Sequence, residues 1–188
     1  SIKSVRLSAL WDRIEPQQDK FNFSELDWYV GEAQKKETKV VLAIGFKLPR
    51  WPECRAPKWF SKDRQLIMLK NVIEHYEQDS GQARMTIAAY QLENEPLLEF
   101  GVCPKPDRNF LKKEVAFVRA KTQKPIISTD SGELRPWVTP MKLSDIFGTT
   151  LYRVVENPII GQFTYPLKPW FYRIKSNFVR QFFAPNNQ

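Results

Sequence analysis

The residues best suited to acid–base chemistry lie in a short polar segment, Glu93-Asn94-Glu95-Pro96, which follows the apolar run MTIAAYQL (85–92). The run predicts a buried strand, and Pro96 ends it because proline cannot donate to a sheet ladder. A carboxyl group at a strand terminus is well placed to donate and accept a proton. We expect Glu95 to be that group and Glu93 to be structural and to face away from it. The competing interpretation is that Glu95 is a solvated loop glutamate.

Strands and helices alternate around this segment. Short apolar runs predict strands near 4–10, 39–46, 85–92, 125–130 and 146–155. Amphipathic stretches between them predict helices that start near residues 24, 63, 107 and 168, with a short helical piece at 135–143. No hairpin signal such as Asn-Gly separates the strands, so this order predicts βαβ units and a parallel sheet.

The aromatic and acidic residues in the loops after the strands favour a barrel over an open nucleotide-binding sheet. The segment after the first strand, LSALWDRIEP, contains no glycine, whereas a dinucleotide fold usually has a glycine-rich turn there. Barrels place their chemistry in the loops after each strand, where Trp11, Trp51, Glu95 and Glu156 are found here. An eight-stranded barrel typically needs about 250 residues, and this chain has 188. We therefore predict an α/β fold: one partial TIM (β/α)8 barrel domain over residues 1–188.

Three segments, in the correct order, resemble the clan A glycoside hydrolases, the retaining (β/α)8 enzymes that include cellulases and family 42 β-galactosidases. Asn94-Glu95-Pro96 is similar to their Asn-Glu-Pro motif. VRLSALWDRIEPQQDKFNFSELDWYV (5–30) resembles the segment around their second barrel strand, and VVLAIGFKLPRWP (40–52) resembles their third strand and its substrate-facing loop. The resemblance implies that the chain maps onto barrel strands two to six and lacks the first and the last two strands.

The resemblance also implies roles for individual residues. Glu95 matches the general acid/base of a retaining enzyme acting on β-linked glycosides, and Asn94 matches the residue that hydrogen-bonds the sugar 2-hydroxyl. Arg6 matches an arginine that supports the catalytic carboxylates, and a buried arginine needs an anionic partner, so we expect a carboxylate nearby. The nucleophile of the family, a Glu after strand seven, has no counterpart here, so the chain alone is expected to be inactive. We assign Glu156 to a surface loop.

Aromatic residues in the loops suit a carbohydrate site, because their flat faces stack on the apolar faces of sugar rings. We expect Trp11, Trp51 and Tyr152 to bind substrate, although each is also compatible with a core role. The alternative function is a non-catalytic carbohydrate-binding barrel fragment that uses the same aromatic rim.

Composition restricts the other partners and cofactors. The 29 Lys+Arg against 21 Asp+Glu give a net charge of +8, but the basic residues are scattered and no nucleic-acid motif is present. We expect an oligosaccharide or glycoside substrate and no nucleic acid. His75 has no Cys or Asp at ligand spacing, and Cys54 and Cys103 lack the paired spacing of a zinc site, so neither a metal nor another cofactor is expected.

The chain shows no apolar run near the roughly 18 residues that span a bilayer and no signal-peptide pattern, so we expect no membrane segment here. Two cysteines are too few for a disulfide-dense scaffold, which favours a reducing, cytoplasmic compartment. A partial barrel leaves two sheet edges and the apolar faces of its helices open, so self-association is expected.

Overall fold

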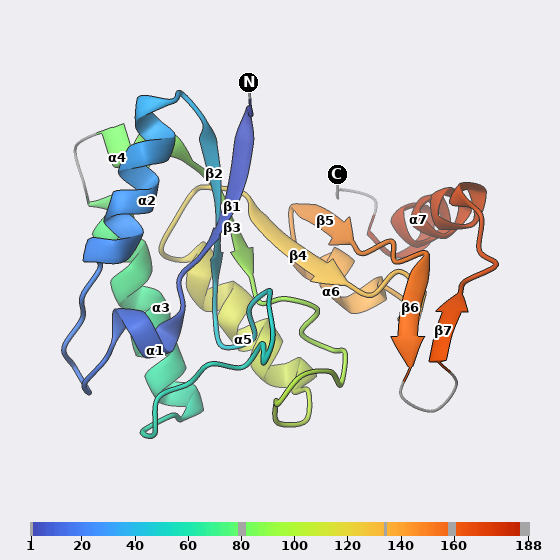
Figure 1. Ribbon diagram of the computed structural model, residues 1–188, viewed down its shortest axis with the longest axis horizontal. Helices are drawn as coiled ribbons and strands as arrows, with labels where there is room; N and C mark the ends of the chain where they lie inside the picture. Colours follow the sequence, from blue (N-terminus) through green and yellow to red (C-terminus); the bar gives the residue numbers. More distant parts are fainter. Residues whose placement is uncertain (1, 79–81, 134, 158–160, 185–188) are drawn as a thin grey trace.

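The computed structural model describes residues 2–78, 82–133, 135–157 and 161–184. A parallel sheet in the order β1-β2-β3-β4-β5 runs through its centre (Figure 1). Its strands are β1 (Ser4–Ser8), β2 (Lys39–Ile44), β3 (Ile87–Leu92), β4 (Ile126–Asp130) and β5 (Ile146–Thr149). Within the described part of the chain β1 and β5 each pair with one neighbour, so the sheet does not close. The predicted partial barrel of parallel strands alternating with helices is confirmed.

Seven helices are found among the described residues: α1 (Trp11–Ile14), α2 (Ser24–Lys35), α3 (Lys62–Glu77), α4 (Gln82–Thr86), α5 (Arg108–Arg119), α6 (Val138–Leu143) and α7 (Pro169–Phe183). Helices α2, α3 and α5 cover one face of the sheet, and their apolar stripes join the strands in the main core (Figure 1). Val30 of α2, Leu69 of α3 and Val115 of α5 are buried in this core.

Side chains cap the starts of α3 and α5. The side chain of Asp107 accepts hydrogen bonds from the backbone N–H groups of Asn109 and Phe110, so it caps α5 as expected. Helix α3 begins at Lys62, close to the predicted start near residue 63, and Ser61 caps it: the Ser61 hydroxyl accepts from the Arg64 N–H at 3.2 Å. A side-chain oxygen must come just before the helix to reach these N–H groups, and Asp63 already lies within the first turn.

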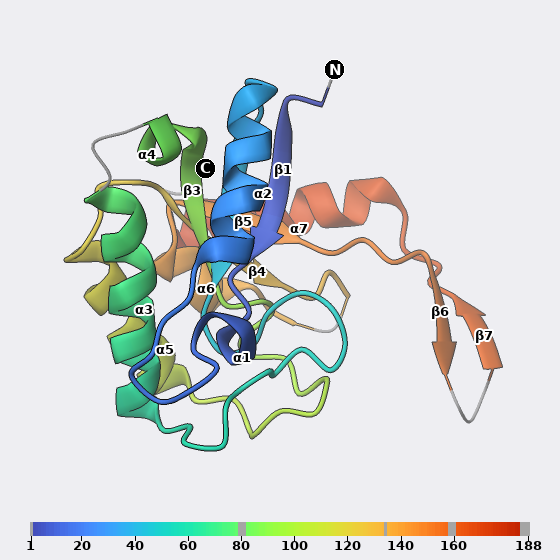
Figure 2. The ribbon, with the colours of Figure 1, turned by 60° about the vertical axis from the view of Figure 1, so that its left-hand side comes forward.

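The prediction of a single strand over 146–155 with no hairpin is wrong. Strand β5 ends at Thr149, and β6 (Val154–Asn157) pairs with β7 (Gly161–Thr164) as an antiparallel ribbon. The ribbon projects from the body of the molecule beyond β5 (Figure 2). Helix α7 follows it and packs through Val179 on α6, in a second small core with Trp137 and Met141.

Candidate active site

A cavity of about 780 Å³ opens on the face of the sheet away from α2, α3 and α5. Every strand of the sheet lines it, through Arg6, Val41, Gln91, Ile127 and Gly148. Successive residues of a strand point to opposite faces of the sheet. Leu42 and Leu92, which follow the cavity residues Val41 and Gln91, accordingly lie in the core under the helices. The cavity therefore occupies what would be the inside of the barrel, with the loops after the strands around one end.

Glu95 lines this cavity and is held in place from two neighbouring strands. Its side chain is 6% exposed, and the Thr150 hydroxyl donates a 2.8 Å hydrogen bond to Oε1. Its backbone N–H donates to the hydroxyl of Thr129, at the end of β4, at 3.0 Å. The backbone has a φ of 47°, a left-handed conformation that costs energy for a residue with a Cβ and is found at functional sites. Glu95 is thus fixed beside the cavity.

A hydrogen-bonded chain of polar side chains connects Arg6 to Asn94. Arg6 Nη1 donates to Gln91 Oε1 at 3.0 Å, and Gln91 Nε2 donates to Asn94 Oδ1 at 3.4 Å. The expected carboxylate partner of Arg6 is not found among the described residues. Arg6 is exposed to the open cavity rather than buried, so water solvates its charge and no anionic partner is needed.

The three aromatic candidates have different surroundings. Tyr152 lines the cavity and is 60% exposed. Trp51 is 66% exposed and stands edge-on to Phe100, a residue of the cavity wall, with ring centroids 6.1 Å apart. Trp11 is fully buried in the main core and donates a 2.6 Å hydrogen bond to Glu15. The structure therefore brings Tyr152 and Trp51 to the cavity or its rim, and it does not bring Trp11 there.

Two further carboxylates line the cavity away from β3. Glu133 follows β4 and accepts a 2.7 Å hydrogen bond from the Tyr172 hydroxyl. Glu156 lies on strand β6, not in the expected surface loop, although its side chain is exposed as expected. Asp130, at the end of β4, is buried, and this burial raises its pKa to about 6. The cavity lining carries more acidic than basic side chains, opposite in sign to the net charge of the chain.

The sequence interpretation missed Glu53, which lies in the proline-rich loop after β2. Its side chain is 8% exposed and lines the cavity beside Asn94, whose Nδ2 is 3.5 Å from Glu53 Oε1. Oε2 is 3.3 Å from the Nζ of Lys47, which is also buried. Burial raises the pKa of Glu53, Lys47 acts against that rise, and the nearby charge of Glu95 adds to it. A glutamate among prolines carries no local motif that would have identified it.

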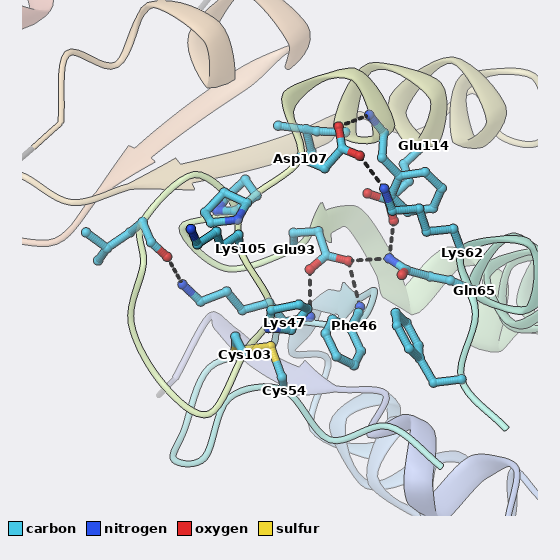
Figure 3. A pocket seen from close by; sticks show the side chains of 17 residues that line it. Phe46, Lys47, Cys54, Lys62, Gln65, Glu93, Cys103, Lys105, Asp107 and Glu114 are labelled. Atoms are coloured by element: carbon cyan, nitrogen blue, oxygen red, sulfur yellow. Dashed lines mark hydrogen bonds and ion pairs between the residues drawn. A yellow bond between two sulfur atoms is a disulfide. The ribbon is translucent and has the colours of Figure 1, made fainter. Parts of the chain in front are cut away.

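Glu93 faces the opposite side of the sheet from Glu95. Its carboxylate accepts hydrogen bonds of 2.6 Å from the backbone N–H groups of both Phe46 and Lys47 (Figure 3). Gln65 Nε2 donates to Glu93 at 2.9 Å and also to Glu114, so one amide joins two buried carboxyl groups. These residues line a small pocket of about 90 Å³ under the helices. Glu93 therefore has the structural surroundings expected of it.

Cys54 and Cys103 form a disulfide, with Cα atoms 5.3 Å apart (Figure 3). The bond ties the loop after β2 to the segment after β3. The prediction from sequence did not pair these two cysteines, which lie 49 residues apart in the chain. Among the described residues no three acidic, His or Cys side chains are grouped as metal ligands, and no helix there is long and apolar enough to cross a membrane.

Residues 1–93 match the family model of the family 42 glycoside hydrolases, described as beta-galactosidase. No curated protein matches the chain.

Solved structures share the fold at low sequence identity. A psychrophilic family 10 endo-beta-1,4-xylanase is 11% identical with a TM-score of 0.62, over 98% of this chain and 63% of its own. The beta-galactosidase of Bacillus circulans sp. alkalophilus is 13% identical with a TM-score of 0.60, over 95% of this chain and 38% of its own. The beta-galactosidase of the psychrophilic Marinomonas ef1 is 12% identical with a TM-score of 0.57, over 81% of this chain and 37% of its own.

This chain thus spans little more than a third of these two beta-galactosidases. Its sheet corresponds to part of a barrel that the larger proteins contain. The resemblance to the clan A glycoside hydrolases that the three sequence segments indicate is therefore confirmed, for a chain whose fold corresponds to part of their (β/α)8 barrel.

Proposed function

We propose that the cavity binds a β-linked glycoside and that Glu95 is the general acid/base of a retaining glycoside hydrolase. The observation that carries the proposal is the placement of Glu95: a buried carboxyl group at the end of an inner strand, beside a cavity of about 780 Å³. A general acid must reach the leaving oxygen of the bound substrate, and this position allows it. Asn94, on the same wall, is suited to hydrogen-bond the sugar 2-hydroxyl.

In this mechanism Glu95 first donates its proton to the glycosidic oxygen as the C–O bond breaks, and later removes a proton from the attacking water. The Thr150 hydroxyl holds the carboxyl group in one orientation during both steps. A retaining mechanism also needs a nucleophilic carboxylate about 5–5.5 Å from the acid/base. We assign that role to no residue of this chain, and so we expect the isolated chain to hydrolyse glycosides slowly or not at all.

The test supplies the nucleophile from solution. Sodium azide should attack C1 of phenyl β-galactosides or β-xylosides while Glu95 protonates the departing phenol, giving a glycosyl azide of inverted configuration. Glu95→Gln should abolish this reaction for the phenyl glycosides, whose leaving group needs a proton. The variant should retain much of it for 2,4-dinitrophenyl glycosides, whose leaving group needs little protonation. This difference between leaving groups identifies an acid rather than a residue needed for folding.

One outcome would contradict the proposal, and a second would contradict only the expected inactivity of the isolated chain. The absence of sugar binding by calorimetry, at millimolar concentrations of either glycoside, would remove the function altogether. Hydrolysis without azide and with retained configuration, lost in Glu95→Gln, would show that another carboxylate of this chain is the nucleophile.

A second candidate function is carbohydrate binding without catalysis. The exposed Trp51 beside Phe100 at the rim of the cavity favours it, because such a surface stacks on sugar rings. Binding that changes tryptophan fluorescence, together with no azide-assisted cleavage of any glycoside, would favour this candidate over the first.

We also propose that the chain associates with itself. In the described structure β1 and β5 are open edges, and α7 exposes Trp170, Ile174, Phe178 and Phe182 at four-residue intervals. Open strands and contiguous apolar surface both promote association in water.

A further inference from the structure

The loop that contains Glu53 is fastened on both sides. Lys47 and Cys54 form an isolated bridge across its base, and the Leu48 N–H donates to the Glu53 carbonyl at 3.0 Å. The Val102 N–H donates to the Pro52 carbonyl at 3.0 Å, and the Cys54–Cys103 disulfide lies next to it. Glu53 itself has a φ of 68°, in the left-handed region that a glycine would occupy more easily.

The ion pair with Lys47 satisfies only part of the Glu53 carboxylate. Lys47 Nζ already donates to the backbone carbonyls of Glu95, at 3.1 Å, and Leu98, at 2.7 Å. Glu53 Oε2 is near Nζ but receives no hydrogen bond from any described group, and it is shielded from solvent. Oε1 has one long contact, with Asn94. A carboxylate oxygen has about two acceptor sites, so Oε1, with this one long contact, keeps acceptor capacity for a ligand in the cavity that Glu53 lines.

Hydroxyl groups are the ligands that such a carboxylate lacks. A sugar ring presents several hydroxyl donors, and a hydrogen bond from each to a charged acceptor is stronger than one to a neutral group. Asn94 offers both an amide donor and an acceptor next to Glu53, so the two side chains together suit two adjacent hydroxyls of one ring. Glu95 lies on the same wall of the cavity, which places this ring at the bond to be cleaved.

From this arrangement we infer that Glu53 is a specificity-determining residue that binds the 3-hydroxyl of the sugar ring whose 2-hydroxyl is bound by Asn94. This assignment rests on the proposed function of the cavity. Lys47 acts as a positioning residue, since it neutralises Glu53 and joins its loop to the Glu95 segment. A site built to hydrogen-bond a hydroxyl strongly rejects the analogue that lacks it, because the buried partner is then left unpaired. The ligand class is therefore a pyranoside with a free 3-hydroxyl.

The experiment compares the full chain and Glu53→Gln by calorimetry against p-nitrophenyl β-galactoside and β-xyloside, with 3-deoxy forms of both and the 6-deoxy galactoside. The wild-type chain should bind the 3-deoxy glycosides about tenfold more weakly than the parents, as expected for a hydrogen bond to a charged group. Glu53→Gln should weaken binding of the parent glycosides similarly and should no longer distinguish them from the 3-deoxy forms. The 6-deoxy galactoside should show no such coupling to Glu53. Glu99→Gln, which removes an exposed charge on the same segment as Leu98, is the matched control and should bind like wild type.

The outcomes separate this inference from the function on which it rests. Failure of the wild-type chain to bind any parent glycoside would overturn both. If the wild-type chain binds but does not discriminate against the 3-deoxy forms, the inference is overturned and the function stands. The same holds if Glu53→Gln, shown to be folded by its thermal melt, still discriminates as wild type does. The deoxy comparison on the wild-type chain needs no variant, so it decides even if the substitution prevents folding.

Discussion

The Thr150 hydroxyl donates a 2.8 Å hydrogen bond to Oε1 of Glu95, although 55 residues separate them in the sequence. Glu95 follows β3 and Thr150 follows β5, so the bond spans the carboxyl ends of strands on either side of β4. A single rotamer of the carboxyl group is thereby favoured, and the orientation of a proton donor depends on its rotamer.

Replacement of Thr150 by valine should therefore reduce catalysis more than binding. We expect the azide-assisted rate on phenyl β-glycosides to fall roughly tenfold, because a hydrogen bond to a charged group contributes about 1.5–3 kcal/mol. Thr150→Ser keeps the hydroxyl and should retain most of the rate. Equal rates for Thr150→Val and wild type, with both proteins folded, would show that this bond does not orient the acid.

The pair Glu93 and Glu114 should make stability fall as the pH rises. Burial raises the pKa of Glu93 to about 7 despite its two backbone hydrogen bonds. The pKa of Glu114 is raised too, first by burial and then by the charge of Glu93. Both carboxyls bind protons more tightly in the folded state than in the unfolded state. The stabilisation is therefore complete below about pH 4.5 and is lost as the pH rises through 7.

Urea unfolding at pH 4.5 and at pH 8 measures this loss of unfolding free energy. We expect it to be on the order of 3 kcal/mol, because a shift of one pKa unit corresponds to about 1.4 kcal/mol. Glu114→Gln keeps the shape of the side chain, removes one charge and should flatten the pH profile. Glu99→Gln, at an exposed position, should leave the profile unchanged. A wild-type stability that increases across this range would contradict the assignment.

Strands buried under helices were predictable because each contains a short apolar run, which is unbroken at 40–44 and is followed by polar residues at 128–130. The runs at 39–46 and 125–130 correspond closely to β2 and β4. The ribbon of β6 and β7 was not predictable in the same way: β7 is exposed along its whole length, so no apolar pattern sets it apart from a loop. The run at 146–155 divides after Thr149 because Thr149 pairs with Asp130, the last residue of β4, so the partner strand ends there.

The candidate site was predictable only where a local motif marks it. Asn94 and Glu95 adjoin each other on one strand end, and their motif was sufficient to find them. Glu53 reaches Asn94 across 41 residues, and Cys54 reaches Cys103 across 49. Such contacts depend on how the loops after different strands meet in space, which neither hydrophobic period nor residue spacing encodes.

Loss of the Cys54–Cys103 disulfide should weaken both folding and sugar binding. The bond closes a loop of 49 residues, and the chain-entropy relation assigns about 4 kcal/mol to a loop of that size. Because Glu53 precedes Cys54, the freed loop should also bind glycosides more weakly. Urea unfolding and calorimetry of the double variant Cys54→Ser/Cys103→Ser measure the two effects. A variant as stable as wild type, with the same affinity, would exclude a role for the bond.

Helix α7 should mediate the proposed self-association. Residues at four-residue intervals share one helix face, and Ile174 and Phe178 lie in the middle of its exposed apolar stripe. The double variant Ile174→Glu/Phe178→Lys places both charges on that face, so it should sediment as a 22.1 kDa monomer while wild type forms larger species. Met85→Lys changes an exposed apolar residue on α4 and should behave like wild type. A wild-type chain that sediments as a monomer at micromolar concentration and melts cooperatively would refute the expectation, since an open apolar helix face and two open strands could not then be sites of association.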